Sequence, residues 1–217
     1  MITYLPSLFC LLFAGMLVRA EFVGSRAGSW AFKPAAAAMF VVQAVISGAV
    51  ESGYGLLILT GLVLSAAGDV LLIPRERQVL FKLGMASFGL AHVVYAAAFF
   101  GLGFAGGGWP APQLWLSSTF AAAFALVFVW RWLGPHLQSD ERPLVLIYMA
   151  LILAMFVGSW VKSSLDGNGW VVLAALMFAA SDLFVAKDRF VKREPENALV
   201  ITPLYFGAQL IFALTIV

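Results

Sequence analysis

The chain has 217 residues, of which 63% are hydrophobic and only 11% are charged, and its mean hydropathy is +0.98. A soluble domain carries about 25% charged residues, so this composition excludes an ordinary soluble domain. The formal net charge of +2 gives no indication of a nucleic-acid partner, and none is expected. The single cysteine, Cys10, excludes an intramolecular disulfide and a cysteine-cluster metal site.

Apolar runs follow one another along the whole chain, each long enough to cross a hydrocarbon core of about 30 Å as a helix. We predict an all-α polytopic membrane protein with eight transmembrane helices, forming a single integral membrane domain over residues 1–217. The first run has no basic residue before it, which is the wrong polarity for a cleaved signal peptide, so we expect it to remain a spanning helix. The predicted spans are 2–19, 34–50, 53–73, 79–103, 112–132, 143–161, 168–186 and 198–217.

Basic residues sort almost completely to one side of this eight-span map. They gather in the loops after spans 1, 3, 5 and 7 and at the adjoining span ends, and only Lys162 lies on the other side. Short loops rich in lysine and arginine stay in the cytoplasm. We therefore expect both termini to be non-cytoplasmic, and the charge pattern suits a bacterial inner membrane. The run 186–197, AKDRFVKREPEN, has mixed charge and is expected to be a solvated loop.

The chain shows signs of an internal repeat with an offset of 113 residues. Span 3 contains LSAAGDVLL and span 7 contains FAASDLFVA, so Asp69 and Asp182 occupy equivalent places, and the same offset relates His92 to Tyr205. Span 2 begins with a lysine–proline pair and span 6 with an arginine–proline pair, where proline suits the first helical turn. We predict a 4+4 parallel repeat with its site between the halves. The pseudo-repeats cover about 1–103 and 112–217.

Few polar residues lie inside the predicted spans, where an aspartate near a helix centre costs about 2.5–3.5 kcal/mol to insert. Asp69 and Asp182 each lie about one turn inside the cytoplasmic end of their span, and His92 lies about halfway along span 4. Each of these residues taken alone has a purely structural interpretation, as a hydrogen-bonded group within the bundle. Together they predict a polar pocket between helices, open toward the cytoplasmic headgroup region. Further polar residues expected near it are Ser65, Tyr95, Tyr148, Tyr205 and Gln209.

Other chemistries are less well supported by the spacing. His136 lies in a loop and neither HxxxH nor HExxH occurs, so we expect no metal and no cofactor, although two acids and a histidine have the chemistry to bind one. No Gly-x-Ser-x-Gly elbow is present. A Ser-His-Asp triad made of Ser65, His92 and Asp182 stays open as an alternative.

Four motifs, GLVLSAAGD, GMASFGLAHVVY, FAASDLFVAKDRF and PLYFGAQLIF, occur in this order. Together they resemble the YhhN family of membrane proteins, which includes the animal lysoplasmalogenases, over about residues 33–214. The resemblance implies an eight-span bundle that hydrolyses the alkenyl (vinyl) ether bond of lysoplasmalogens to a fatty aldehyde and glycerophosphoethanolamine or glycerophosphocholine. It implies that the family's intramembrane acids and histidine correspond to Asp69, Asp182 and His92, with Ser65, Tyr205 and Gln209 in the same motifs.

The implied chemistry suits these residues. A vinyl ether reacts when an acid protonates its outer alkene carbon, and water then captures the oxocarbenium ion; two carboxylates serve glycoside hydrolysis through a similar cation. Because two close carboxylates in a low dielectric resist double ionisation, we expect one of Asp69 and Asp182 to hold a proton and the other to stabilise the cation. His92 is expected to relay protons or orient water. The expected substrate-binding residues are Lys33, at the interface for the lipid phosphate, with Ser65, Tyr95, Tyr148, Tyr205 and Gln209.

A proton-coupled transporter of lyso-lipid or another small molecule is the alternative, because two similar halves with intramembrane acids also describe carriers. Against it, the acids lie toward one side of the membrane and no span reads as broken in its middle. A non-catalytic scaffold or lipid sensor is a third possibility. The expected partners are a lyso-phospholipid substrate and membrane lipids, with the site toward the cytoplasmic leaflet, and the sequence does not indicate an oligomeric state.

Overall fold

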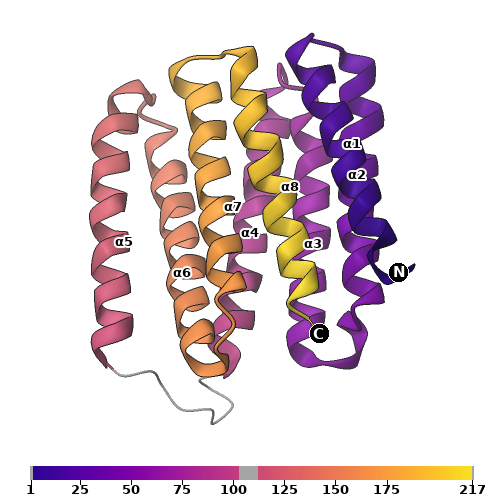
Figure 1. Cartoon of the computed structure of the whole chain (residues 1–217). Helices are drawn as coiled ribbons and strands as arrows, with labels where there is room; N and C mark the ends of the chain where they lie inside the picture. The colour runs from indigo at the N-terminus through magenta and orange to yellow at the C-terminus, as the bar shows by residue number, and fades with distance from the viewer. Residues whose placement is uncertain (1, 103–111, 217) are drawn as a thin grey trace.

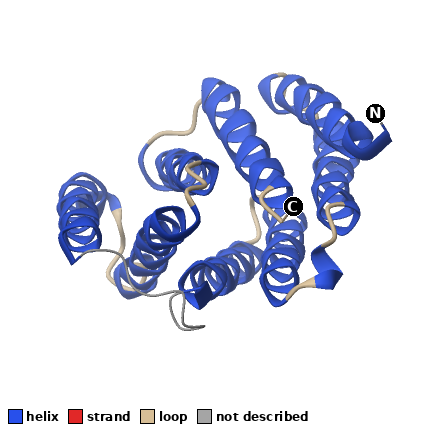
Figure 2. Cartoon of the chain, turned by 60° about the horizontal axis from the view of Figure 1, so that its bottom comes forward, coloured by secondary structure: helices blue, strands red, loops and turns tan. Residues whose placement is uncertain are grey.

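The computed structural model describes residues 2–102 and 112–216, and all regular secondary structure in these ranges is helical (Figure 2). Within them, eight helices are long and apolar enough to cross a membrane, which confirms the predicted number of spans. Gly103 and Val217, at the ends of two predicted spans, lie outside the described residues. The helices are α1 (Leu5–Phe22), α2 (Arg26–Ile46), α3 (Gly53–Leu72), α4 (Gln78–Leu102), α5 (Pro112–Leu133), α6 (Arg142–Asp166), α7 (Trp170–Ala186) and α8 (Ala198–Leu214).

The start of α2 corrects the sequence prediction. The Ser25 side chain accepts a hydrogen bond from the backbone N–H of Gly28 at 3.2 Å, so the helix begins at Arg26 and Pro34 lies inside it rather than in its first turn. Serine is a favoured helix cap. Its capping hydrogen bond sets the start of the helix, and Pro34 is tolerated inside the helix at the loss of one backbone donor. Pro143, in contrast, lies in the first turn of α6 as predicted.

The helices run side by side in one bundle (Figure 1). Helices α1 and α2, α3 and α4, and α7 and α8 pack as neighbouring pairs, while α4 also packs on α6 and α2 also packs on α8. Helix α5 stands at one edge and packs mainly on α6. This arrangement places α3, α4, α7 and α8, which carry the predicted acids, histidine and Tyr205, in the middle of the bundle.

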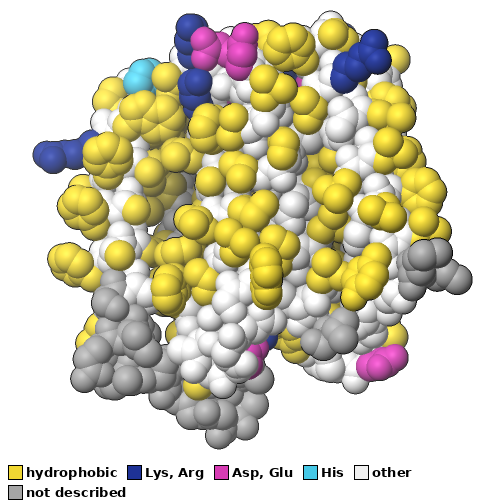
Figure 3. Space-filling view, viewed as in Figure 1, with side chains coloured by type: hydrophobic (Ala, Val, Ile, Leu, Met, Phe, Trp, Pro, Cys, Tyr) yellow, Lys and Arg dark blue, Asp and Glu magenta, His cyan; other side chains and the backbone are white. Residues whose placement is uncertain are grey.

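On the face shown in Figure 3, apolar side chains cover most of the bundle and most of the visible charged side chains gather at the upper end. On α5, Phe120, Phe124 and Phe128 are 78%, 70% and 68% exposed at successive turns. Water would penalise such a surface, whereas lipid tails would not. The protein is therefore an integral membrane protein. We call its charged end, where the loops after α1, α3, α5 and α7 lie, the basic end.

An aromatic cluster fills the middle of the bundle behind the acids. The ring of Phe178 lies 4.6 Å from that of His92 and 5.6 Å from that of Tyr205 between centroids. Phe88 lies 5.7 Å from Tyr205 on another side. At Gly68, beside the acid of α3, an added side chain would collide with the Phe88 ring, so α3 and α4 approach closely there. This close approach fixes the rotation of α4 relative to α3.

Candidate active site

A cavity of about 560 Å³ lies within the bundle between α2–α4 and α5–α8. Its wall is mostly alanine, leucine, valine, methionine and phenylalanine side chains, a composition suited to a lipid tail. The polar exceptions include five residues that the sequence predicted for the site. These are Lys33, Asp69, Tyr148, Asp182 and Tyr205.

The two aspartates face this cavity from different helices, and each has its own tyrosine donor. Asp69 on α3 is 4% exposed and accepts a hydrogen bond from the Tyr205 hydroxyl of α8 at 2.6 Å. Asp182 on α7 has a side chain that is 10% exposed and accepts from the Tyr148 hydroxyl of α6 at 3.0 Å. Within the described residues the two carboxylates do not share a hydrogen bond. A proton held directly between them is therefore not part of this geometry, although both line one cavity.

His92 lies behind Asp182 rather than on the cavity wall. Its Nδ1 is 2.7 Å from the backbone oxygen of Phe88, and because a carbonyl oxygen only accepts, this nitrogen carries a hydrogen. Its Nε2 faces Oδ2 of Asp182 at 3.3 Å. Nε2 has no hydrogen-bond partner among the described residues, so the two groups lie close together without sharing a hydrogen bond. His92 is fully buried, stacked on Phe178 and edge-on to Tyr148.

Three other predicted residues form a second buried group beyond the aromatic cluster. The Tyr95 hydroxyl donates to Oε1 of Gln209 at 2.8 Å, and Ser65 is fully buried one turn from Asp69 on α3. None of the three is part of the cavity wall in the described structure. In the same residues, Ser65 Oγ has no hydrogen-bond partner. The Ser-His-Asp alternative therefore lacks the serine–histidine hydrogen bond that activates a nucleophile.

Lys33 lies where the cavity meets the basic end, and it is not a free cation. Its Nζ is 3.2 Å from Oε1 of Glu21, which also receives Arg75 at 3.0 Å. The second oxygen of Glu21 accepts from the Thr202 hydroxyl at 3.2 Å. Glu21 and Arg75 were not among the residues predicted for the site. The sequence feature that could have indicated this ion-pair group is Glu21 itself, an acid in the last turn of α1, because a buried carboxylate needs a partner.

Fold and site together define a polytopic helical membrane protein with two acids, Asp69 and Asp182, on the wall of a mostly apolar cavity of about 560 Å³. The model of the YhhN family matches residues 28–216, so the chain belongs to the YhhN family. This finding confirms the resemblance shown by the four sequence motifs.

Proteins named lysoplasmalogenases are similar over most of the chain. It is 31% identical over 166 residues to lysoplasmalogenase TMEM86A of Bos taurus, covering 74% of this chain and 65% of the relative. It is 35% identical over 167 residues to lysoplasmalogenase TMEM86B of Homo sapiens, covering 76% and 65%. A lysoplasmalogenase of Mycobacterium tuberculosis is 29% identical over 153 residues, covering 69% and 56%. The chain thus spans less than two thirds of the length of these relatives, and no solved structure matches it.

Proposed function

We propose that the protein is a lysoplasmalogenase-type hydrolase. It cleaves the vinyl ether bond of a lyso-phospholipid to a fatty aldehyde and glycerophosphoethanolamine or glycerophosphocholine. The observation that carries this proposal is the placement of Asp69 and Asp182 on the wall of one apolar cavity. The similarity of the chain to proteins named lysoplasmalogenases supports the choice of reaction.

The cavity suits a lipid with a single chain. On α5 and α7, small residues such as Ala122, Ala125, Ala179 and Ala180 line it and leave room for a tail between these helices. Helix α5 packs mainly on α6, and α5 and α7 line the cavity together, so we propose that the tail enters from the bilayer between α5 and α7. The vinyl ether lies at the glycerol end of the tail. A substrate that enters in this way brings its reactive bond toward the acids and its headgroup toward the basic end.

Asp182, with Nε2 of His92 3.3 Å from its Oδ2, is the proposed proton donor. The proton moves from Oδ2 of Asp182 to the outer alkene carbon, and the positive charge forms on the carbon bonded to the ether oxygen. Asp69, held by the Tyr205 hydroxyl, is the anion that stabilises this oxocarbenium ion. Paired carboxylates act on a comparable cation in glycoside hydrolysis.

Water then completes the reaction. It attacks the cationic carbon and gives up a proton to the Asp182–His92 pair, which restores the starting state. The resulting hemiacetal breaks its bond to the glycerol oxygen, its hydroxyl proton passing to that oxygen. The products are the aldehyde and a glycerophospho alcohol, and the sequence of steps needs no added oxidant or reductant.

The predicted internal repeat gains support from the pairing of these residues. Asp69 bonds Tyr205, and Asp182 contacts His92, so each acid meets a residue of the opposite half. Asp182 lies 113 positions after Asp69, and His92 lies 113 positions before Tyr205, so the two pairs are equivalent under the repeat. Two tandem copies that exchange the same contact across their interface would produce this relation.

We also propose an orientation. Loops with many arginines and lysines stay in the cytoplasm, which places the basic end in the cytoplasm and both termini outside. The acids then face the cytoplasmic leaflet, in a bacterial inner membrane.

Product analysis tests the proposed reaction. The detergent-solubilised protein is offered vinyl-ether, alkyl-ether and acyl lyso-phospholipids side by side, and products are identified by mass spectrometry. We expect fatty aldehyde from the vinyl ether alone, with one deuterium on its second carbon when the solvent is heavy water. Fatty acid from the acyl lipid, or no product together with counterflow of labelled lyso-lipid in proteoliposomes, would contradict the proposal; the second result would favour a transporter.

A further inference from the structure

A second cavity, of about 460 Å³, adjoins the first at the basic end. We call it the vestibule. It lies among the ends of α1, α3 and α7, the segment that follows α7, and the start of α8. Lys33, Leu72, Phe81, Phe190 and Ile201 line both cavities, so the two spaces meet at these residues. A ligand too long for one cavity therefore extends into the other.

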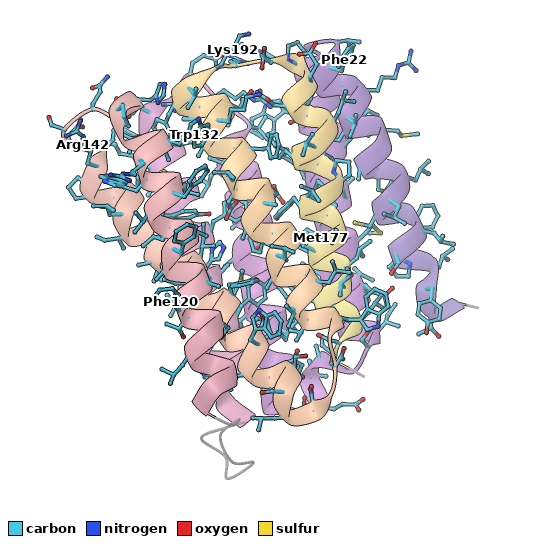
Figure 4. All side chains as sticks on the ribbon, turned by 60° about the vertical axis from the view of Figure 1, so that its left-hand side comes forward. Phe22, Phe120, Trp132, Arg142, Met177 and Lys192 are labelled. Atoms are coloured by element: carbon cyan, nitrogen blue, oxygen red, sulfur yellow. The ribbon has the colours of Figure 1, made fainter. Side chains whose placement is uncertain are left out.

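The vestibule is strongly charged, in contrast to the cavity that holds the acids. Its cations outnumber its anions, since it is lined by Lys33, Arg75, Arg189, Lys192 and Arg193 and by Glu21, Asp188 and Glu194. Figure 4 shows Lys192 and Phe22 at this end of the bundle. Glu21 bonds Lys33 and Arg75, and Glu194 bonds Lys192. Arg189 and Arg193 have no carboxylate partner among the described residues, so a positive charge remains for an anionic ligand.

Arg189 lines the vestibule and lies over Phe81, which lines both cavities. Its guanidinium carbon lies 4.2 Å from the centroid of the Phe81 ring, and its Nη1 donates to the backbone oxygen of Arg75 at 3.3 Å. A guanidinium has five N–H donors, so most remain available. The run 186–197 was predicted to be a solvated loop, but its Lys187–Val191 part continues α7 as a π-helical turn. Such turns are frequent at functional sites.

We propose that the vestibule binds the phosphodiester of the lipid headgroup, with Arg189 as its main ligand and Arg193 adding positive charge. Planar guanidinium groups match the oxygens of a phosphate. In the substrate, a glycerol unit separates the phosphate from the vinyl ether. A phosphate in the vestibule therefore leaves the ether near Lys33 and the acids while the tail occupies the first cavity. This inference rests on the proposed function and locates the headgroup subsite for its lyso-phospholipid substrate.

The test compares a lysoplasmalogen with the corresponding 1-alkenylglycerol, which has the same tail and vinyl ether but no phosphate. Arg189→Gln is measured beside Arg77→Gln, which removes a charge from the same end of the bundle but does not line the vestibule. The measured quantity is kcat/KM for the phospholipid divided by kcat/KM for the alkenylglycerol. We expect this ratio to fall about tenfold in R189Q, because one charge-assisted hydrogen bond to the phosphate is lost, and to stay at the wild-type value in R77Q. An unchanged ratio in R189Q, or an equal fall in R77Q, would overturn the proposal.

Two further arms keep the test decisive. In the wild-type protein, KM for the phospholipid should rise with added salt more steeply than KM for alkenylglycerol, and equal slopes would contradict the assignment. If the effect of R189Q appears only when inorganic phosphate is present, the site serves free phosphate and the headgroup assignment is wrong. Absence of aldehyde from both lipids would instead refute the proposed reaction, which separates the two failures.

Discussion

Replacing Tyr205 by phenylalanine removes the hydroxyl that donates to Asp69 at 2.6 Å and keeps the ring. The ring packs 5.6 Å from Phe178 and 5.7 Å from Phe88 between centroids, so the aromatic cluster should persist. Asp69 has no other hydrogen-bond donor among the described residues. A hydrogen bond to a charged group contributes about 1.5–3 kcal/mol, so Y205F should lower kcat for aldehyde release about 10- to 150-fold.

The assay follows aldehyde release from lysoplasmalogen by purified protein in detergent, with Tyr148→Phe as the matched control. Tyr148 donates to Asp182, which keeps its contact with His92, so Y148F should lose less than Y205F. Both variants should unfold thermally at nearly the wild-type temperature. A folded Y205F with wild-type kcat, or a larger loss in Y148F than in Y205F, would refute this reasoning about Asp69.

Two further substitutions test the second layer of the site and its packing. His92→Gln should lower kcat and leave KM nearly unchanged, because His92 contacts Asp182 but does not line the cavity. Steady-state kinetics of aldehyde release measure both constants, and a change in KM alone would contradict this prediction. Gly68→Ala should lower the free energy of unfolding by about 1–3 kcal/mol, because its methyl group would collide with the Phe88 ring. The midpoint temperature of thermal unfolding should fall accordingly. Gly15→Ala has open space around it and is the matched control, and equal midpoints for the two variants would count against the close approach of α3 and α4.

The order and number of helices were predictable because a membrane core imposes one strong requirement. Every spanning segment must satisfy its own backbone hydrogen bonds and present apolar side chains over its length. Helix ends follow weaker local signals. Helix α2 begins after its cap at Ser25 rather than at Pro34. The π-helical turn at Lys187–Val191 lies in a run whose mixed charge had indicated a loop.

The site was predictable in part, because helical spacing gives the face of a helix but not its rotation against neighbours. Asp69, Asp182, Tyr148, Tyr205 and Lys33 do meet at one cavity. His92 lies behind Asp182 instead.

Ser65, Tyr95 and Gln209 form a separate buried group, whose contact with substrate stays a prediction. The close approach of α3 and α4 at Gly68 sets the rotation of these helices. It is possible only because glycine has no side chain, and a hydropathy pattern does not show which glycines lie at a helix contact. Glu21 and Arg189 were missed because their partners come from distant helices and loops.

The central claim is that the two cavity aspartates carry out the hydrolysis, and one measurement tests it most directly. Asp69→Asn and Asp182→Asn are each purified in detergent, shown to be folded by thermal unfolding, and assayed for aldehyde release from lysoplasmalogen. Acid–base groups contribute about 100-fold or more to such reactions, so each variant should lose at least that much activity. Wild-type rates of aldehyde release in both folded variants would contradict the claim.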